Sequence, residues 1–198
     1  MVLLVFAVLA LLTAVLRGGR LSCLAAMGIR SGWLILVAFA MQVWLVYFST
    51  GKTGGALDPS AWVHVGSYAL LMAALWQNRH LPGMPAIALG LLLNAAVITA
   101  NGGFMPIEPA AVERLGHADR VVDPGLGSRV NMAKDVVLSR NLTHLWLLSD
   151  VFVVALPYPF RTAFSMGDAL LAAGFFVLLH RVMISGQAAE AEAVMPRA

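Results

Sequence analysis

Long apolar runs with very few charged side chains restrict the fold of this sequence more than any other feature. Six runs are bounded by charged residues, glycine or proline, at residues 2–16, 33–50, 61–77, 84–100, 142–160 and 164–180. A helix that crosses a bilayer needs about 17–25 mostly apolar residues. Since isolated strands cannot satisfy their backbone hydrogen bonds in lipid, the runs predict membrane-spanning helices.

Composition favours the same fold class. The 198 residues are 60% hydrophobic and 12% charged, whereas soluble domains are about 45–50% apolar and about 25% charged. The sequence therefore predicts an all-α, polytopic transmembrane bundle of about six spans. The fifth run ends in Pro157 and Pro159, so a re-entrant element is the alternative there. One domain covers residues 1–186, and the Ala/Glu-rich tail 187–198 is expected to be disordered.

Charge and cysteine content exclude several classes of function. Lys and Arg occur singly between apolar runs, a distribution typical of membrane orientation rather than nucleic-acid binding. Cys23 is the single cysteine, which excludes an internal disulfide or a cysteine-based metal cluster. The sequence has neither a phosphate loop nor a dinucleotide fingerprint, so no cofactor and no metal site are predicted.

The positions of the basic residues predict an orientation. The loops after the first, third and fifth runs carry basic residues but no acid, namely Arg17, Arg20, Arg30, Arg79 and Arg161. Basic short loops face the cytoplasm, which places both termini and the long polar segment 101–141 outside. A plain count of Lys and Arg favours the opposite orientation, because residues 101–141 also contain five basic side chains.

The segment 101–141 is the only long polar stretch between the runs. Loops of this length are usually functional or disordered. Residues 109–122 predict a short interfacial helix with Val112, Leu115 and Val122 on its apolar side. We expect this extramembrane loop to offer a surface to a partner protein or to membrane lipid.

Two carboxylates are the candidate catalytic residues. Asp150 lies within an apolar run, where a charged Asp costs at least about 2.5–3.5 kcal/mol. It is interpreted either as a proton carrier, ion ligand or catalytic group, or as a packing residue. Asp168 follows Ser165 at the spacing of a capping box, Ser-x-x-acid, which predicts a role at a helix start. Antiparallel fifth and sixth spans would place the two acids within about 6 Å in depth, so that a proton-sharing pair is permitted.

Other polar side chains are candidates for binding or packing. Ala86, Gly90 and Asn94 recur every four residues, which predicts a close-packing helix face. His64 is expected to point inward. Asn94, Asn101 and His64 are the candidate binding residues.

Two local motifs resemble known families. Asn101-Gly102-Gly103-Phe104-Met105-Pro106 and Phe164-Ser165-Met166-Gly167-Asp168 resemble elements of an uncharacterised bacterial family of small multi-pass membrane proteins. That resemblance implies a bacterial inner membrane and brings no activity. The order of Asn101, Asp150 and Asp168 is also similar to that in lipoprotein signal peptidase, which implies an aspartyl dyad. The sequence departs from the peptidase pattern at Val151 and Ser165, where that family has Arg and Asn.

Three functions follow from these observations. The first is an inner-membrane structural or binding subunit of unassigned activity. The second is an intramembrane aspartyl hydrolase that uses Asp150 and Asp168. The third is a small proton-coupled transporter that uses Asp150.

Overall fold

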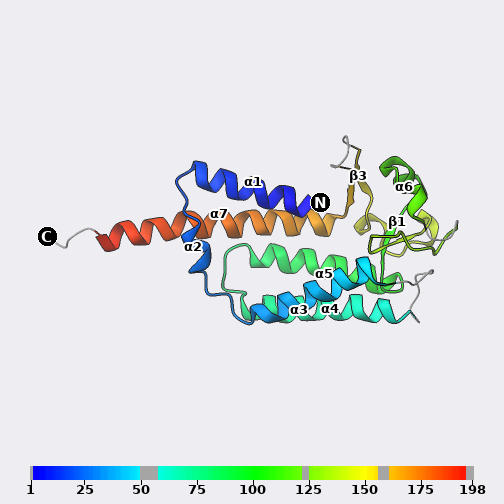
Figure 1. The fold of residues 1–198 in the computed structure, drawn as a ribbon, viewed down its shortest axis with the longest axis horizontal. Coiled ribbons are helices and arrows are strands. Elements are labelled where there is room, and N and C mark those ends of the chain that lie inside the picture. The colour runs from blue at the N-terminus through cyan, green and yellow to red at the C-terminus, as the bar shows by residue number, and fades with distance from the viewer. Residues whose placement is uncertain (1, 50–57, 122–124, 156–160, 195–198) are drawn as a thin grey trace.

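The computed structural model describes residues 2–49, 58–121, 125–155 and 161–194. Its body is a set of nearly aligned helices (Figure 1). They are α1 (Val2–Leu16), the short α2 (Ser22–Ala25), α3 (Gly32–Tyr47), α4 (Pro59–Gln77), α5 (Met84–Ala100) and the long α7 (Met166–Val194). None of the residues in α1, α3, α4 or α5 is Asp, Glu, Lys or Arg. Such helices form because their apolar side chains pack together or meet an apolar solvent.

The segment between α5 and α7 folds into a cap at one end of the body (Figure 1). The cap contains β1 (Met105–Ile107), α6 (Pro109–Leu115), β2 (Asp135–Val137), β3 (Phe152–Val154) and β4 (Thr162–Phe164), with single 3-10 turns at Ala118–Arg120, Arg140–Leu142 and Trp146–Leu148. Strand β1 pairs with β2 in parallel, and β3 pairs with β4 in an antiparallel hairpin. The cap has a hydrophobic core of its own, formed by Ile107, Ala111, Val112, Leu115, Val130 and Val137.

The helices of the body associate mainly in pairs. Helix α3 packs along α4, and α7 packs along both α5 and α1. The main core lies where α4, α5 and α7 meet, around residues such as Leu75, Leu91 and Leu171. Between the α3–α4 pair and the α5–α7 pair the structure leaves the cavity described below.

The expectation of an all-α bundle with about six spans is wrong. Within the described ranges, α7 alone contains a helix long and apolar enough to cross a membrane, at Met166–Ile184. Three further apolar helices, Val5–Leu16, Gly32–Tyr47 and Met84–Ala100, are shorter than such a span. The two small sheets also exclude the all-α class. Apolar composition therefore identified the helices but overestimated how many of them reach spanning length.

The fifth predicted span is the clearest error. Residues 142–155 form 3-10 turns and the strand β3 of the cap, and residues 156–160 lie outside the described part. The run contains Ser149 and Asp150, whose polar groups interrupt an apolar helix, and the β-branched and aromatic residues Phe152, Val153 and Val154 that follow favour a strand.

Because the fifth predicted span is not formed, the C-terminal helix ends at a different place from the one predicted. Helix α7 starts at the cap and runs to the opposite end of the body, so its C-terminal end lies away from the cap (Figure 1). Helix α7 extends to Val194, and residues 195–198 lie outside the described residues. The disorder expected for residues 187–198 stays a prediction. The predicted interfacial helix is present but shorter, as α6.

Candidate functional site

The first motif, residues 101–106, joins the end of α5 to the cap. Asn101 Nδ2 donates to the carbonyls of Val97 (2.8 Å) and His144 (2.9 Å), and Asn101 Oδ1 accepts from the His144 N–H. Asn101 therefore ends α5 and holds the segment that precedes Asp150. Its side chain is occupied by these structural hydrogen bonds.

Gly103 and Phe104 seat the cap on α4. Gly103 has φ +94°, and a Cβ at this position would collide with Ala61. Its carbonyl accepts a hydrogen bond from His64 Nδ1 at 2.8 Å, which fixes the imidazole proton on Nδ1 because a carbonyl only accepts. Phe104 is fully buried, with the Arg129 guanidinium over its ring. The motif thus needs a glycine for close approach and an aromatic ring for packing.

The second motif forms the predicted capping box at the start of α7. The Asp168 N–H donates to Ser165 Oγ at 3.0 Å, and the Ser165 N–H donates to Asp168 Oδ2 at 3.3 Å. Asn94 of α5 joins this box, since its Nδ2 donates to Asp168 Oδ1 and its Oδ1 accepts from Ser165 Oγ, both at 2.8 Å. Asn94 and Asp168 are therefore brought together, as a polar lock between α5 and α7.

Small residues let α5 and α7 approach closely beside this lock. A Cβ on Gly90 would collide with the Gly167 carbonyl, and one on Gly167 would collide with Asn94 Oδ1. The predicted packing face of α5 thus meets α7 through Gly90 and Asn94.

Asp150 lies at the base of the cap rather than inside a helix. Its side chain is 9% exposed, and its Oδ1 is a buried atom without a hydrogen-bond partner among the described residues. Its N–H donates to the carbonyl of Pro106 at 3.3 Å, so β1 positions it. Burial, followed by the charges of Asp135 and Asp168, raises the pKa of Asp150 well above 3.8. A neutral carboxyl at this position can donate or accept a proton.

Two residues of the cap that the sequence analysis did not single out complete this group. Burial raises the pKa of Asp135 to about 6, against the opposing charge of Lys134. Burial likewise lowers the pKa of Lys134, although the neighbouring acids oppose that shift. We call Lys134, Asp135, Asp150 and Asp168 the cap-base cluster. The charges of both Asp135 and Asp168 raise the pKa of Asp150, so each is a candidate for proton sharing with it.

A chain of hydrogen bonds ties the cap-base cluster to the body. Lys134 Nζ donates to Gln42 Oε1 at 2.8 Å, and Gln42 Nε2 donates to Ser67 Oγ at 3.1 Å. Ser67 Oγ in turn donates to the carbonyl of His64 at 2.6 Å. The Lys134 ammonium of the cap is thereby fixed between α3 and α4.

A cavity of about 350 Å³ opens directly below this group, between the two helix pairs. Its walls are apolar, and its end toward the cap carries four polar side chains: Gln42, Tyr68, Lys134 and Asp168. The walls include Ile35, Phe39, Leu71, Leu91, Leu171 and Phe175. Its size matches the roughly 300–1,000 Å³ of small-molecule pockets.

The sequence alone did not mark Lys134 and Asp135 as candidate site residues, since they stand in a long polar segment. Strand pairing and burial give these two residues their roles.

His64 and Asn101 make hydrogen bonds at the junction between the cap and the body, and neither side chain lines the cavity. Within the described part of the chain, no three His, Cys, Asp or Glu side chains gather to hold a metal ion.

Comparison with known proteins now places the chain in a family. Residues 26–180 match the model of a family of unknown function, DUF5317. The chain belongs to this family. An uncharacterised protein of Thermotoga maritima is 27% identical over 113 residues, which cover 56% of this chain and 58% of that protein. The chain thus matches just over half the length of this relative, and no solved structure matches it. This confirms the resemblance to an uncharacterised family, whereas the multi-pass membrane character and the two motifs of that resemblance stay predictions.

Proposed function

We propose that this member of DUF5317 is a membrane-embedded protein that binds an amphiphile in the cavity between its helices. The apolar part of the ligand would occupy the cavity, and its polar head would meet Gln42, Tyr68, Lys134 and Asp168. The observation that carries the proposal is the cavity itself, with mainly apolar walls and four polar side chains gathered at its end toward the cap; Asn78, at the other end, is held by hydrogen bonds to Arg30 and Ala74.

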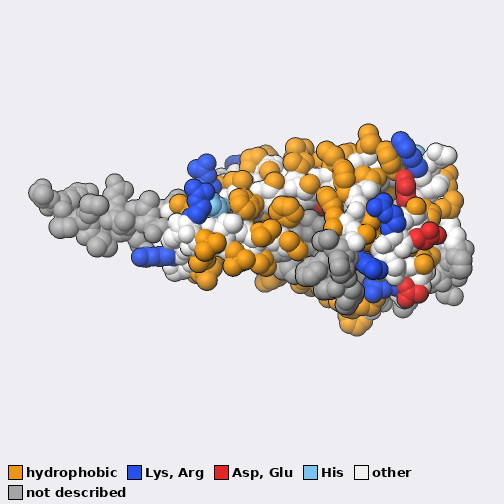
Figure 2. Space-filling model, turned by 90° about the horizontal axis from the view of Figure 1, so that it is seen from above, with side chains coloured by type: hydrophobic (Ala, Val, Ile, Leu, Met, Phe, Trp, Pro, Cys, Tyr) orange, Lys and Arg blue, Asp and Glu red, His pale blue; other side chains and the backbone are white. Residues whose placement is uncertain are grey.

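The surface of the body supports a lipid environment. Large apolar side chains on α1 and α3 face outward, with Leu9 47%, Leu12 55% and Leu36 69% exposed. Figure 2 shows this apolar surface between two ends that carry the charged side chains. A contiguous apolar surface of this extent is unusual on a soluble monomer, whereas contact with lipid chains would cover it.

Aromatic side chains mark the limits of that surface. Trp33 and Trp76 are exposed near the end opposite the cap, and Tyr47 and Trp62 are exposed near the cap. The two sets are separated by about 21 Å of helix, at about 1.5 Å per residue. Trp and Tyr collect at both membrane–water interfaces, so the pattern supports a bilayer as the solvent of the body. A bacterial inner membrane is the proposed location.

The polar end of the cavity indicates the kind of head group. It combines an ammonium donor, Lys134, with a carboxylate acceptor, Asp168. The acids of the cap-base cluster outnumber Lys134, which disfavours an anionic head. An uncharged head that both donates and accepts hydrogen bonds, such as a hydroxyl or an amide, satisfies both groups.

Filling the cavity tests the proposal. The protein is purified in lipid nanodiscs, and a spin-labelled long-chain alcohol is titrated into it. Leu71→Trp places a bulky ring in the cavity wall and should abolish saturable binding. Leu89→Trp is the matched control, because Leu89 is 48% exposed on α5 and does not line the cavity. Equal binding by both variants would refute an amphiphile site in this cavity.

A second candidate function is proton transfer at Asp150, as the hydrolase and transporter hypotheses require. The unpartnered buried Oδ1 of Asp150 favours it. A buried, protonated carboxyl reacts with a hydrophobic carbodiimide near neutral pH, and mass spectrometry locates the adduct. We expect Asp150 to be modified and the exposed Asp119 to remain unmodified. Modification of both, or of neither, would contradict a protonated Asp150.

A further inference from the structure

A second hollow, of about 460 Å³, lies on the cap and is separate from the cavity of the body. It is formed where the C-terminal end of α6, the 3-10 turn Ala118–Arg120 and the start of β4 meet. Its polar lining comes from His117, Arg120, Asn131, Asp135, Arg161 and Thr162. Polar and charged groups therefore form a much larger part of this hollow than of the cavity, whose walls are apolar.

Positive charge prevails in the hollow. Arg120 and Arg161 are both exposed and line it together with His117. Within the described residues, neither guanidinium makes a hydrogen bond or an ion pair. The lining contains one acid, Asp135, whose charge is opposed by that of the neighbouring Lys134. Two arginine side chains that face one hollow without a partner among the described residues are suited to an anion.

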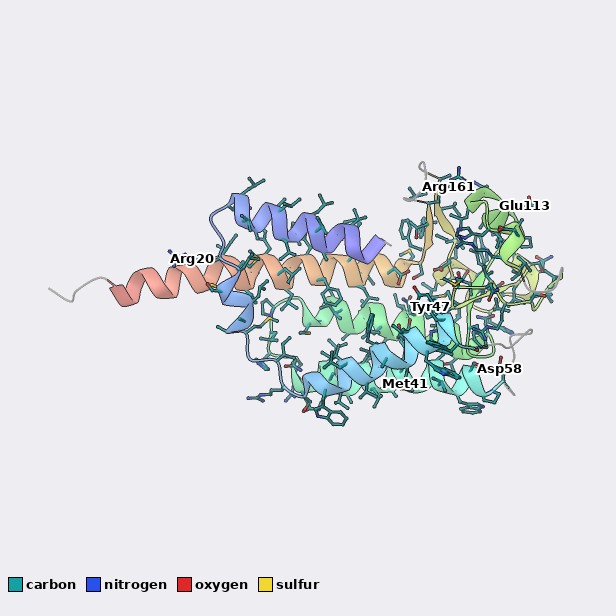
Figure 3. All side chains as sticks on the ribbon, in the orientation of Figure 1. Arg20, Met41, Tyr47, Asp58, Glu113 and Arg161 are labelled. Atoms are coloured by element: carbon teal, nitrogen blue, oxygen red, sulfur yellow. The ribbon has the colours of Figure 1, made fainter. Side chains whose placement is uncertain are left out.

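The backbone holds these side chains in place. Gly116 ends α6 with φ +70°, and the His117 N–H donates to the Val112 carbonyl at 3.0 Å. The N–H of Asn131 donates to the Arg120 carbonyl at 2.7 Å. Arg161 lies over Gly116, where a Cβ would be 2.9 Å from its Nη1 atom. Figure 3 shows Arg161 beside α6 at the outer edge of the cap. Glycine at 116 therefore provides both the turn and the space for the guanidinium.

We propose that this hollow binds a phosphate group. A phosphate dianion matches the charge of the two arginines, and the planar guanidinium donates to two of its oxygens at once. A single carboxylate would leave one arginine without a partner. The volume of the hollow leaves room for the organic part of a phosphomonoester or for a lipid phosphate that enters from the membrane surface.

The charge environment of His117 supplies a reporter for binding. Burial, followed by the charge of Arg120, lowers the pKa of His117; the charge of Asp119 opposes this shift, and Arg161 makes a smaller contribution in the same direction as Arg120. A bound dianion offsets these cations, so the pKa of His117 should rise on binding. The imidazole signals of His117 in NMR report this shift directly, with His117→Gln used for assignment.

Calorimetric titration of the full chain in detergent with glycerol phosphate tests the site. Arg120→Gln and Arg161→Gln should each weaken binding about 10-fold or more, the equivalent of one charge-assisted hydrogen bond. Arg114→Gln on α6 is the control, because Arg114 is exposed but does not line the hollow. Both variants remove exposed side chains, and circular dichroism confirms that they fold.

The source of the phosphate is distinguished by a second arm with nanodiscs that contain phosphatidic acid. Saturable binding of glycerol phosphate identifies a soluble ligand, and binding of phosphatidic acid alone identifies a lipid head group. Either result supports the site, provided that Arg120→Gln and Arg161→Gln weaken the binding that is observed. An equal loss in Arg114→Gln, or no binding in either arm, would overturn the proposal. The site is independent of the amphiphile cavity, whose test uses Leu71→Trp, so each can fail alone.

Discussion

At the junction between the cap and the body, a single residue can need both an unusual backbone conformation and a close contact with its neighbour. Gly103 adopts φ +94° and lies against Ala61 without room for a Cβ, whereas Gly127 adopts φ +86° with nothing within 4 Å of a Cβ. The two glycines share a backbone conformation that L-residues rarely adopt and differ in their surroundings. This difference separates the cost of backbone strain from the cost of a collision.

Substitution by alanine at these two glycines should therefore have unequal effects. Gly127→Ala should lower the free energy of unfolding by about 1–2 kcal/mol, the cost of a left-handed conformation. Gly103→Ala should cost more, because the new methyl group also displaces α4 from the cap. Denaturant unfolding followed by circular dichroism in detergent measures both. Equal costs would mean that the contact with Ala61 has no energetic role.

The carboxyls of the cap-base cluster should make stability depend on pH. Burial raises the pKa of Asp135 from 3.8 to about 6 and raises that of Asp150 as well. The folded state therefore prefers the protonated acids. Their contribution to stability is complete below about pH 4 and is lost as the pH rises through about 6.

The midpoint of thermal unfolding should accordingly fall between about pH 4.5 and about pH 7.5 in the wild-type protein. Asp135→Asn keeps the side chain neutral and should flatten this dependence. Asp119→Asn, on the exposed 3-10 turn, should leave it unchanged. A wild-type midpoint that rises over the same interval would contradict the assigned protonation states.

At the scale of elements, the capping box at the start of α7 was predicted from Ser165 and Asp168 alone, because it depends on local spacing. The fifth span was wrongly predicted for a related reason. Hydropathy over residues 142–160 does not specify conformation: Leu142, Leu145 and Leu147 lie in or next to 3-10 turns of the cap and are half exposed or more, so an apolar run without a long helix gives the same signal as a span. Pairing of β1 with β2 brings Asp135 to the site, and no local pattern encodes that pairing. The polar lock between Asn94 and Asp168 likewise depends on how α5 and α7 pack.

Substitutions in the polar lock between α5 and α7 should differ in how much they lower the free energy of unfolding. Ser165→Ala removes a helix cap and should cost about 0.5–2 kcal/mol, and it also leaves Asn94 Oδ1 without its donor. Asp168→Asn should be mild, because an amide oxygen can still accept from Asn94. A double-mutant cycle between Asn94→Ala and Asp168→Ala, measured by unfolding, should give a coupling energy of at least about 0.5 kcal/mol. Additive effects would show that the two side chains do not interact energetically.

At the scale of the whole molecule, basic and acidic residues are distributed unequally between the two ends. The structure shows this distribution more clearly than the sequence does. Arg17, Arg20, Arg30 and Arg79 lie in the turns at the end of the body opposite the cap, whereas Arg161, expected beside them, belongs to the cap. Figure 3 shows Arg20 and Arg161 at opposite ends. The acids Asp58, Glu108, Glu113, Asp119, Asp135, Asp150 and Asp168 all lie in or near the cap. If the body is in a membrane, the end whose turns carry only basic residues is the cytoplasmic one, and the cap is outside. Glu190 and Glu192 lie beyond that end, in the last turns of α7.

Cysteine labelling in intact cells tests this orientation. Ser128, although in the cap, is only 4% exposed and would react poorly. Glu113→Cys on the exposed face of α6 is the better reporter, with His80→Cys at the opposite end as its pair, both in a Cys23→Ala background. A membrane-impermeant maleimide that has access to the outer face of the inner membrane should label Glu113→Cys and should label His80→Cys only after that membrane is permeabilised. The reverse pattern would invert the orientation. Labelling of both sites in a soluble fraction, before any permeabilisation, would instead remove the membrane from the proposal, because the apolar faces of α1 and α3 would then need a protein partner to cover them.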